Sequence, residues 1–282
     1  MGRKILAISL VLVMALAFTA CEGDFPAAQE IVDGAVRALD DVTSYQFEMT
    51  TTMDVSSESE GEAFEGATAT DRSGTLDLAN RQMHTFTTMN TVGTGTYDMD
   101  RTQETYIIDD MVYTMTVDTP DSEPSWMKSE MPAELWEQMN QIKPQIEILG
   151  TSAVEVVGSE QLDGVDCYVL ESTPDTEQLW QLFMQQMGTA SDMAPDITMR
   201  VLDEMCENYS AKQWIAKDSY FLMKVEVEIS MELTPETMGS PEEEGEAAVA
   251  IRITMLVYDY NQPVSIELPP EAEEAIEVPI YF

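Results

Sequence analysis

The chain has 282 residues, 44% of them hydrophobic, and carries 53 acidic against 13 basic side chains, a formal net charge of −40. A hydrophobic share of this size can build a large buried core, so the composition indicates a folded protein and excludes a disordered acidic tail. The negative charge repels phosphate backbones, which excludes nucleic-acid binding.

The chain begins with the features of an export signal. Arg3 and Lys4 precede an apolar run at 5–18, and small residues stand just before Cys21. The run is shorter than the about 20 residues that a membrane-spanning helix needs, so it predicts a cleaved signal; an uncleaved anchor helix is the alternative.

These features predict the organisation of the whole chain. We expect a lipoprotein signal peptide at 1–20, a lipidated Cys21 with a tether at 21–26, and a single domain at 27–282. Acyl chains on Cys21 would hold an exported domain on the outer face of the cell membrane, on its periplasmic or extracellular side.

The domain opens with a helix and a long strand. Apolar residues recur every three or four positions over 27–42, which is typical of an amphipathic helix. Apolar and polar residues then alternate over 45–55, which predicts a strand with one apolar face. The segment 56–71 is rich in Ser, Glu and Gly and is predicted to be a solvated loop or a frayed edge.

Two hairpins are predicted next. The first covers 74–89 and turns near Asn80, and the second covers 105–117 with a turn at 109–110. The inward-facing candidates of the first hairpin are Leu76, Leu78, Met83 and Phe86.

The middle of the chain mixes helices with a third hairpin. A helix is predicted at 133–142, and Pro144 limits its length. Asp163-Gly164 is a strong turn signal between strands at 154–162 and 165–172. Further helices are predicted at 176–187 and 197–205.

The last third is regular. A strand at 209–216 and a turn at 217–219 lead into two long alternating strands, at 223–233 and 249–257, which an acidic loop separates. Such long alternating strands are typical of an antiparallel sheet with one buried face. We therefore predict an α+β fold, a strongly curved antiparallel half-barrel with the helices covering its concave face.

Helices that line a broad curved sheet without filling it leave a cavity, and apolar side chains suit a flexible apolar ligand there. Nineteen of the methionines lie after residue 20, and their unbranched side chains can repack around ligands of different shape. Methionines that fill a closed core are the alternative. The predicted cavity-lining residues are Phe47, Met49, Met53, Met223, Val225, Val227, Ile229, Met231, Val249, Ile251, Ile253 and Met255.

Two cysteines remain after Cys21. Outside the cytoplasm an even pair is more often bridged than free, so Cys167 and Cys206 are predicted to form a disulfide, with two small buried thiols as the alternative.

The sequence carries no recognisable catalytic machinery. It has one histidine, His84, and no nucleophile elbow, zinc-binding helix or phosphate-binding glycine loop. Asp98, Asp100 and Glu104 could hold calcium, but chance explains their clustering in so acidic a chain. We therefore expect no enzyme activity, no metal and no cofactor.

Several segments together resemble the LolA-like bacterial lipoproteins of the LppX/LprG type. They are the export signal with Cys21 and the segments 44–47, 104–113, 157–168, 213–215 and 258–264, with Lys224. The resemblance implies an open antiparallel half-barrel closed by helices, which holds the acyl chains of a lipid or lipoprotein outside the cytoplasmic membrane.

Two functions are therefore weighed. The first is a membrane-anchored carrier or chaperone that binds acyl chains in a hydrophobic cavity. The second is a non-enzymatic structural, sensor or protein-interaction module of the cell surface, which uses the same fold with a filled core.

Overall fold

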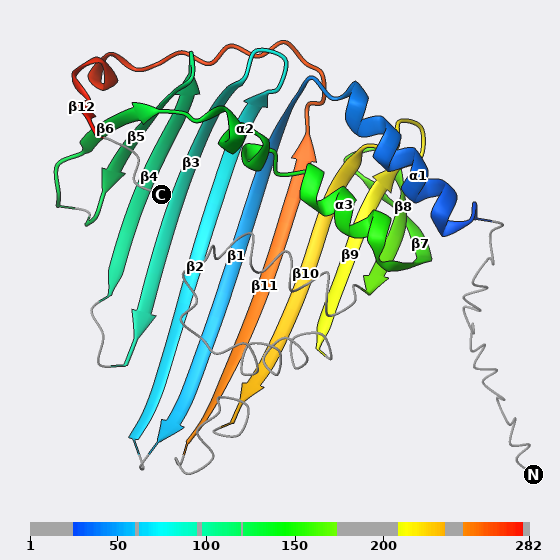
Figure 1. Cartoon of the computed structure of the whole chain (residues 1–282). Coiled ribbons are helices and arrows are strands. Elements are labelled where there is room, and N and C mark those ends of the chain that lie inside the picture. The colour runs from blue at the N-terminus through cyan, green and yellow to red at the C-terminus, as the bar shows by residue number, and fades with distance from the viewer. Residues whose placement is uncertain are drawn as a thin grey trace, which may run out of the picture.

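The structure is a computed structural model that describes residues 25–59, 62–94, 98–119, 121–173, 208–234 and 245–278. Its described strands form one twelve-stranded sheet in the order β12-β6-β5-β4-β3-β2-β1-β11-β10-β9-β8-β7. Neighbouring strands are antiparallel except for the short pair β12–β6. The sheet is open and curved, and three helices lie on one of its faces (Figure 1). The predicted half-barrel architecture is confirmed.

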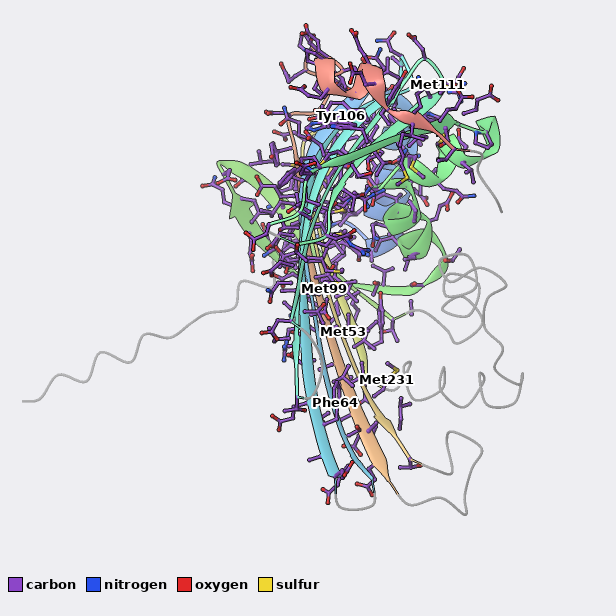
Figure 2. The ribbon with its side chains drawn as sticks, turned by 90° about the vertical axis from the view of Figure 1, so that its left-hand side faces the viewer. Met53, Phe64, Met99, Tyr106, Met111 and Met231 are labelled. Carbon is purple, nitrogen blue, oxygen red and sulfur yellow. The ribbon has the colours of Figure 1, made fainter. Side chains whose placement is uncertain are left out.

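The helices are α1 (Ala28–Ala38), followed by a 3-10 turn at Leu39–Asp41, α2 (Ala133–Met139) and α3 (Lys143–Thr151). The strands are β1 (Ser44–Ser59), β2 (Glu62–Asp77), β3 (Gln82–Gly93), β4 (Met99–Ile108), β5 (Met111–Val117), β6 (Ser125–Glu130), β7 (Ala153–Leu162), β8 (Val165–Thr173), β9 (Tyr209–Ala216), β10 (Leu222–Leu233), β11 (Glu246–Tyr258) and β12 (Ile276–Glu277). We call the face that bears α1 to α3 the inner face and the opposite one the outer face (Figure 2).

Helix α1 follows the predicted amphipathic pattern. Its residues Ile31, Val32 and Ala35 are buried, which is the face expected from the three-to-four spacing. Gly34 allows a close approach, because a Cβ there would lie 2.4 Å from Cδ1 of the Tyr220 ring. The first helix therefore packs directly onto the turn that precedes β10.

The prediction of a solvated loop or a frayed edge at 56–71 is wrong, because β1 runs to Ser59, β2 begins at Glu62 and both strands lie inside the sheet. Both strands have 16 residues and pair over their full length. β2 pairs with β1 along its whole length and with β3 from Gly66 onward, so most of its backbone groups are satisfied on both sides. This pairing outweighs the weak strand propensity of Ser, Glu and Gly.

The region after β6 also differs from the prediction. Pro144 does not end a helical region; it lies in the first turn of α3, which follows α2 after a short break. Proline is favoured at this position because the first N–H groups of a helix have no intrahelical partner. The predicted helices at 176–187 and 197–205 lie outside the described residues.

The last described segment crosses the upper edge of the sheet. After β11, the Asn261 side-chain oxygen accepts hydrogen bonds from the Thr43 backbone N–H at 2.7 Å and from its hydroxyl at 2.9 Å. The chain then passes over the strand ends to β12, which pairs with β6 at the far edge (Figure 1). The beginning and end of the domain are thus joined at the top of β1.

None of the helices among the described residues is long and apolar enough to cross a membrane. The expected signal segment, residues 1–20, and Cys21 lie outside those residues.

Candidate functional site

Eleven of the twelve predicted cavity residues share the inner face, on the adjacent strands β1, β11 and β10. The strand register aligns them in rows across the sheet. The rows are Met49–Met255–Val225, Ile253–Val227, Met53–Ile251–Ile229 and Val249–Met231, with Phe47 opposite Val257 above them.

Met223 is the exception, and its predicted direction is wrong. The pairing of β10 with β9 shifts between Leu222 and Lys224, which is a β-bulge. The extra residue turns Met223 to the outer face, where it packs against a small cluster with Cys167 and Trp214. Strict alternation therefore holds only from Lys224 onward.

Burial on the inner face decreases down the strands. At the upper end of β1, Tyr45 and Phe47 are fully buried, whereas Met53 is 37% exposed. On β10, Val225 and Val227 are buried and Met231 is half-buried. The described helices cross the upper part of the sheet, and no described helix crosses the lower part of β1, β10 and β11 (Figure 1).

The upper part of the inner face is closed. Beneath α1 and α3 the packed side chains enclose a space of about 10 Å³, too small for a ligand. The Tyr45 hydroxyl accepts a hydrogen bond from the Gln141 backbone N–H at 2.8 Å and lies 3.2 Å from Oδ1 of Asn140. Burial raises the pKa of this hydroxyl well above its usual range. The loop between α2 and α3 is thus fastened to the sheet.

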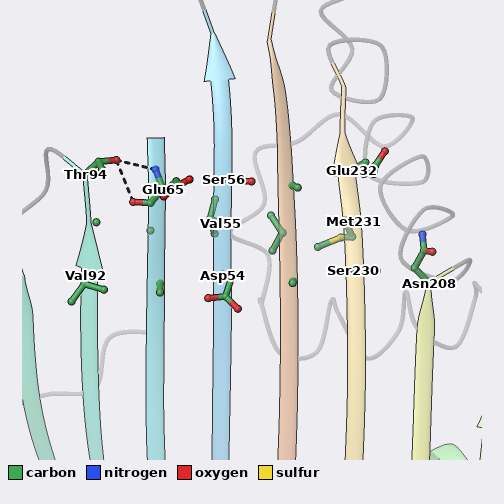
Figure 3. A pocket seen from close by; sticks show the side chains of 16 residues that line it. Asp54, Val55, Ser56, Glu65, Val92, Thr94, Asn208, Ser230, Met231 and Glu232 are labelled. Atoms are coloured by element: carbon green, nitrogen blue, oxygen red, sulfur yellow. Dashed lines mark hydrogen bonds between the residues drawn. The ribbon is translucent and has the colours of Figure 1, made fainter. Parts of the chain in front are cut away.

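The lower part contains a hollow of about 860 Å³ (Figure 3). Small residues line much of it, among them Gly66 and Gly93 on β2 and β3, together with Val55, Val249 and Met231. Its size lies within the range of ligand-binding cavities. We call this region, from Thr51 down β1 with its row partners on β10 and β11, the lower inner face.

The inner face is chemically asymmetric. On β2 the register continues two of these rows with hydroxyl side chains, because Thr70 lies opposite Thr51 and Thr68 lies opposite Met53. On β3 the same two rows end in Met89 and Thr91. The Oγ1 atoms of Thr68 and Thr91 are 3.1 Å apart, within hydrogen-bond distance. The inner face is therefore mainly apolar on β1, β10 and β11, whereas β2 presents hydroxyl groups.

Arg72 is the main inner-face residue that the sequence reasoning missed. It lies opposite Met49 on β1 and Thr87 on β3. The signal was the alternation of Thr68, Thr70 and Arg72, which was hidden because half of this stretch was assigned to a loop.

The first predicted hairpin supplied part of the closed core. Leu76 and Met83 are buried and Leu78 packs against the same cluster, as expected. Phe86 does not point inward: it is 39% exposed. Strand residues alternate between the two faces, so Phe86 shares the outer face with His84, whereas Met83 lies on the inner face.

His84 contacts two side chains of β4, Glu104 and Tyr106. Its Nε2 lies 2.8 Å from Oε1 of Glu104, which also accepts a hydrogen bond from the Tyr106 hydroxyl at 2.7 Å. The imidazole stacks on the Tyr106 ring at 4.5 Å between centroids. All groups around the histidine are thus engaged with one another on the outer face of β3 and β4.

Cys167 is buried in the outer-face cluster that contains Met223, Val169 and Trp214. Burial raises the pKa of its thiol. Cys206 lies outside the described residues, so the disulfide stays a prediction.

Solved structures with similar folds were found at low sequence identity. LprF from Mycobacterium bovis is 13% identical, with 87% of this chain and 98% of that one covered at a TM-score of 0.46. The Mycobacterium tuberculosis lipoprotein LppX is also 13% identical, with 86% and 99% covered at a TM-score of 0.39. A putative outer membrane lipoprotein-sorting protein domain from Vibrio parahaemolyticus is 10% identical, with 84% and 95% covered at a TM-score of 0.25.

Among curated proteins, none matches this sequence. A family model does, over residues 27–277, which includes every described helix and strand. The chain therefore belongs to DUF6612, a family of unknown function.

Proposed function

We propose that this protein is an extracytoplasmic lipoprotein that holds the acyl chains of a lipid or of another lipoprotein against its lower inner face. The observation that carries the proposal is the continuity of one apolar face from a closed core into an accessible hollow. Phe47 is fully buried and Met53, three positions down the same face of β1, is 37% exposed beside a hollow of about 860 Å³.

Exposed apolar surface that continues a core is unfavourable unless something covers it, so such surfaces mark binding sites. The side chains of β1, β10 and β11 here are Met, Ile and Val, which contact flexible alkyl chains without specific geometry. The described residues show no matching set of catalytic groups, since His84 and Glu104 satisfy each other on the outer face. Binding without chemistry is the simpler role for this face.

The experiment uses the chain from residue 22 onward, which contains every described element and lacks its own lipid. Mass spectrometry of organic extracts of the purified protein should find lipid in near-stoichiometric amounts, and the delipidated protein should take up a fluorescent fatty acid. Lipid-free protein that takes up none of the probe would contradict the proposal.

A structural or protein-interaction module with a filled core is the second candidate. The tight packing beneath α1 and α3, where about 10 Å³ remains, favours it for the upper part of the molecule. The two candidates differ only in the lower inner face, so absence of lipid uptake there would support the module.

Lipid attachment at Cys21 completes the proposal and is tested separately. The full chain with Cys21→Ser, expressed in a bacterium that processes lipoproteins, should accumulate as an unprocessed precursor or be released from the membrane. Lipid-modified membrane protein from this variant would contradict the assignment.

A further inference from the structure

Arg72 occupies an unusual position at the boundary between the closed and the accessible parts of the inner face. It pairs in register with Met49, one row below Phe47 and one row above Thr51. Its guanidinium carbon lies 5.9 Å from the centroid of the Phe47 ring, so the side chain lies against the lower side of the closed core.

The guanidinium is not satisfied by the described residues. Its Nε is buried and has no hydrogen-bond partner among them. By contrast, Arg81 pairs with Asp110 at 3.1 Å and Arg101 with Asp118 at 2.8 Å. Arg72 as a whole is half-buried, and a charge that is partly removed from water without a counter-charge is unfavourable. A cation–π contact at this distance leaves the N–H donors unused.

The missing partner is notable because the chain has 53 acidic residues against 13 basic ones. Two carboxylates flank Arg72 in the strand register, Asp71 beside it on β2 and Glu48 opposite Ser73 on β1. Both lie on the outer face, where Asp71 accepts a hydrogen bond from the Thr50 hydroxyl and Glu48 accepts one from the Tyr258 hydroxyl. The inner-face neighbours of Arg72 on β1 to β3 carry no charge: Phe47, Met49, Thr51, Thr70, Gly74, Thr85, Thr87 and Met89.

This setting fits an anion that comes from outside the chain. A guanidinium binds carboxylate and phosphate oxygens with two parallel hydrogen bonds, and threonine hydroxyls can donate to the remaining oxygens. Met49, beside Arg72, and Val55 at the hollow are six steps apart along β1, a strand length of about 20 Å. An extended long acyl chain spans a comparable length.

We infer that Arg72 binds the anionic head of an amphiphile, a carboxylate or a phosphate monoester, whose alkyl chain lies along the lower inner face. The inference rests on the proposed function and narrows the ligand class to lipids with one anionic head group, such as fatty acids or lipid phosphate monoesters. The neutral threonines and the unpaired guanidinium select the head, and the Met, Ile and Val side chains of β1, β10 and β11 accept the tail.

The test compares cis-parinaric acid with its methyl ester, which have the same fluorescent chain but differ in head charge. The wild-type chain from residue 22 onward should bind the acid about 10- to 100-fold more tightly, the range expected for a hydrogen bond to a charged group. In Arg72→Gln this preference should disappear, with ester affinity unchanged. Arg101→Gln, which removes an arginine on the inner-face side of β4 that is already paired with Asp118, should keep it.

Each outcome has a defined meaning. Equal affinity of the wild-type protein for acid and ester overturns the inference and leaves the proposed function standing, and this comparison does not depend on whether a variant folds. Binding of neither probe overturns both. Inorganic phosphate separates a lipid head from a free anion. If phosphate displaces the acid at equal concentration, the site recognises the anion without its alkyl chain, and the inference that it selects an amphiphile is overturned.

Discussion

Along β1 the inner face changes from a closed core to the accessible lower inner face. Truncating one side chain in each part and measuring the loss of unfolding free energy tests this change. Phe47→Ala removes a ring that is fully buried between β2 and β11, and such truncations cost about 3 to 5 kcal/mol of unfolding free energy because a cavity remains. Met53→Ala removes a side chain that is already 37% exposed beside the hollow. No closed cavity forms there, so the loss should stay below about 1 kcal/mol.

The assay is urea-induced unfolding followed by far-ultraviolet circular dichroism. The two variants differ in residue type, so the prediction concerns the large difference between them. Similar losses of several kcal/mol in both would show that Met53 lies in a closed core, and the reasoning from exposure would be refuted.

An enlargement at the same site tests function. Met53→Trp should weaken uptake of a fluorescent fatty acid with little loss of stability, because the hollow has room for the ring. Leu256→Trp is the matched control, since Leu256 is 38% exposed on the outer face of neighbouring β11. Equal effects of the two changes on uptake would place the ligand elsewhere.

Three further predictions concern packing, pH and the cysteines. Gly74→Ala should lower the unfolding free energy by about 1 to 3 kcal/mol in urea unfolding, because the new Cβ would lie 2.5 Å from Cε1 of the buried Phe47 ring. Gly158→Ala is the control and should lower it much less, because nothing lies within 4 Å of its new Cβ. Equal losses would contradict the crowding at Gly74. Burial raises the pKa of Tyr209 to about 12, above its unfolded value near 10, so the folded state binds its proton more tightly and stability should fall between about pH 10 and pH 12. Tyr209→Phe should reduce that fall, and an identical pH dependence in the variant would contradict the assignment. Thiol labelling of the unfolded, unreduced protein should leave Cys167 and Cys206 unmodified if they are bridged, and full labelling of both would exclude the disulfide.

Local sequence determined the turns and the faces of most strands. The turn at Asp109-Asp110 has φ values of 54° and 60°, and Asp163-Gly164 has 47° and 87°, which are conformations that Asp and Gly adopt more readily than most residues. The strand predicted at 209–216 is β9 with the same bounds. These features depend on residues that are close in sequence, so a single segment carries the whole signal.

Other elements were decided only by tertiary contacts. The first half of β2 has a loop-like composition, yet it is a strand because β1 pairs with all of it and β3 pairs with it from Gly66 onward. The bulge that turns Met223 to the outer face arises where β10 meets β9, and nothing in the alternating sequence of β10 indicates it.

The sequence pattern also could not predict how deeply each side chain is buried. Alternation shows that Phe47 and Met53 share a face, but one is fully buried and the other is 37% exposed because α1 to α3 cover only the upper part of the sheet. Arg72 shows the same limit, since no described carboxylate lies beside it on the inner face, and this depends on which side chains three adjacent strands bring together. Periodicity determines the face of a side chain, whereas the elements packed over that face determine whether it is core or binding surface.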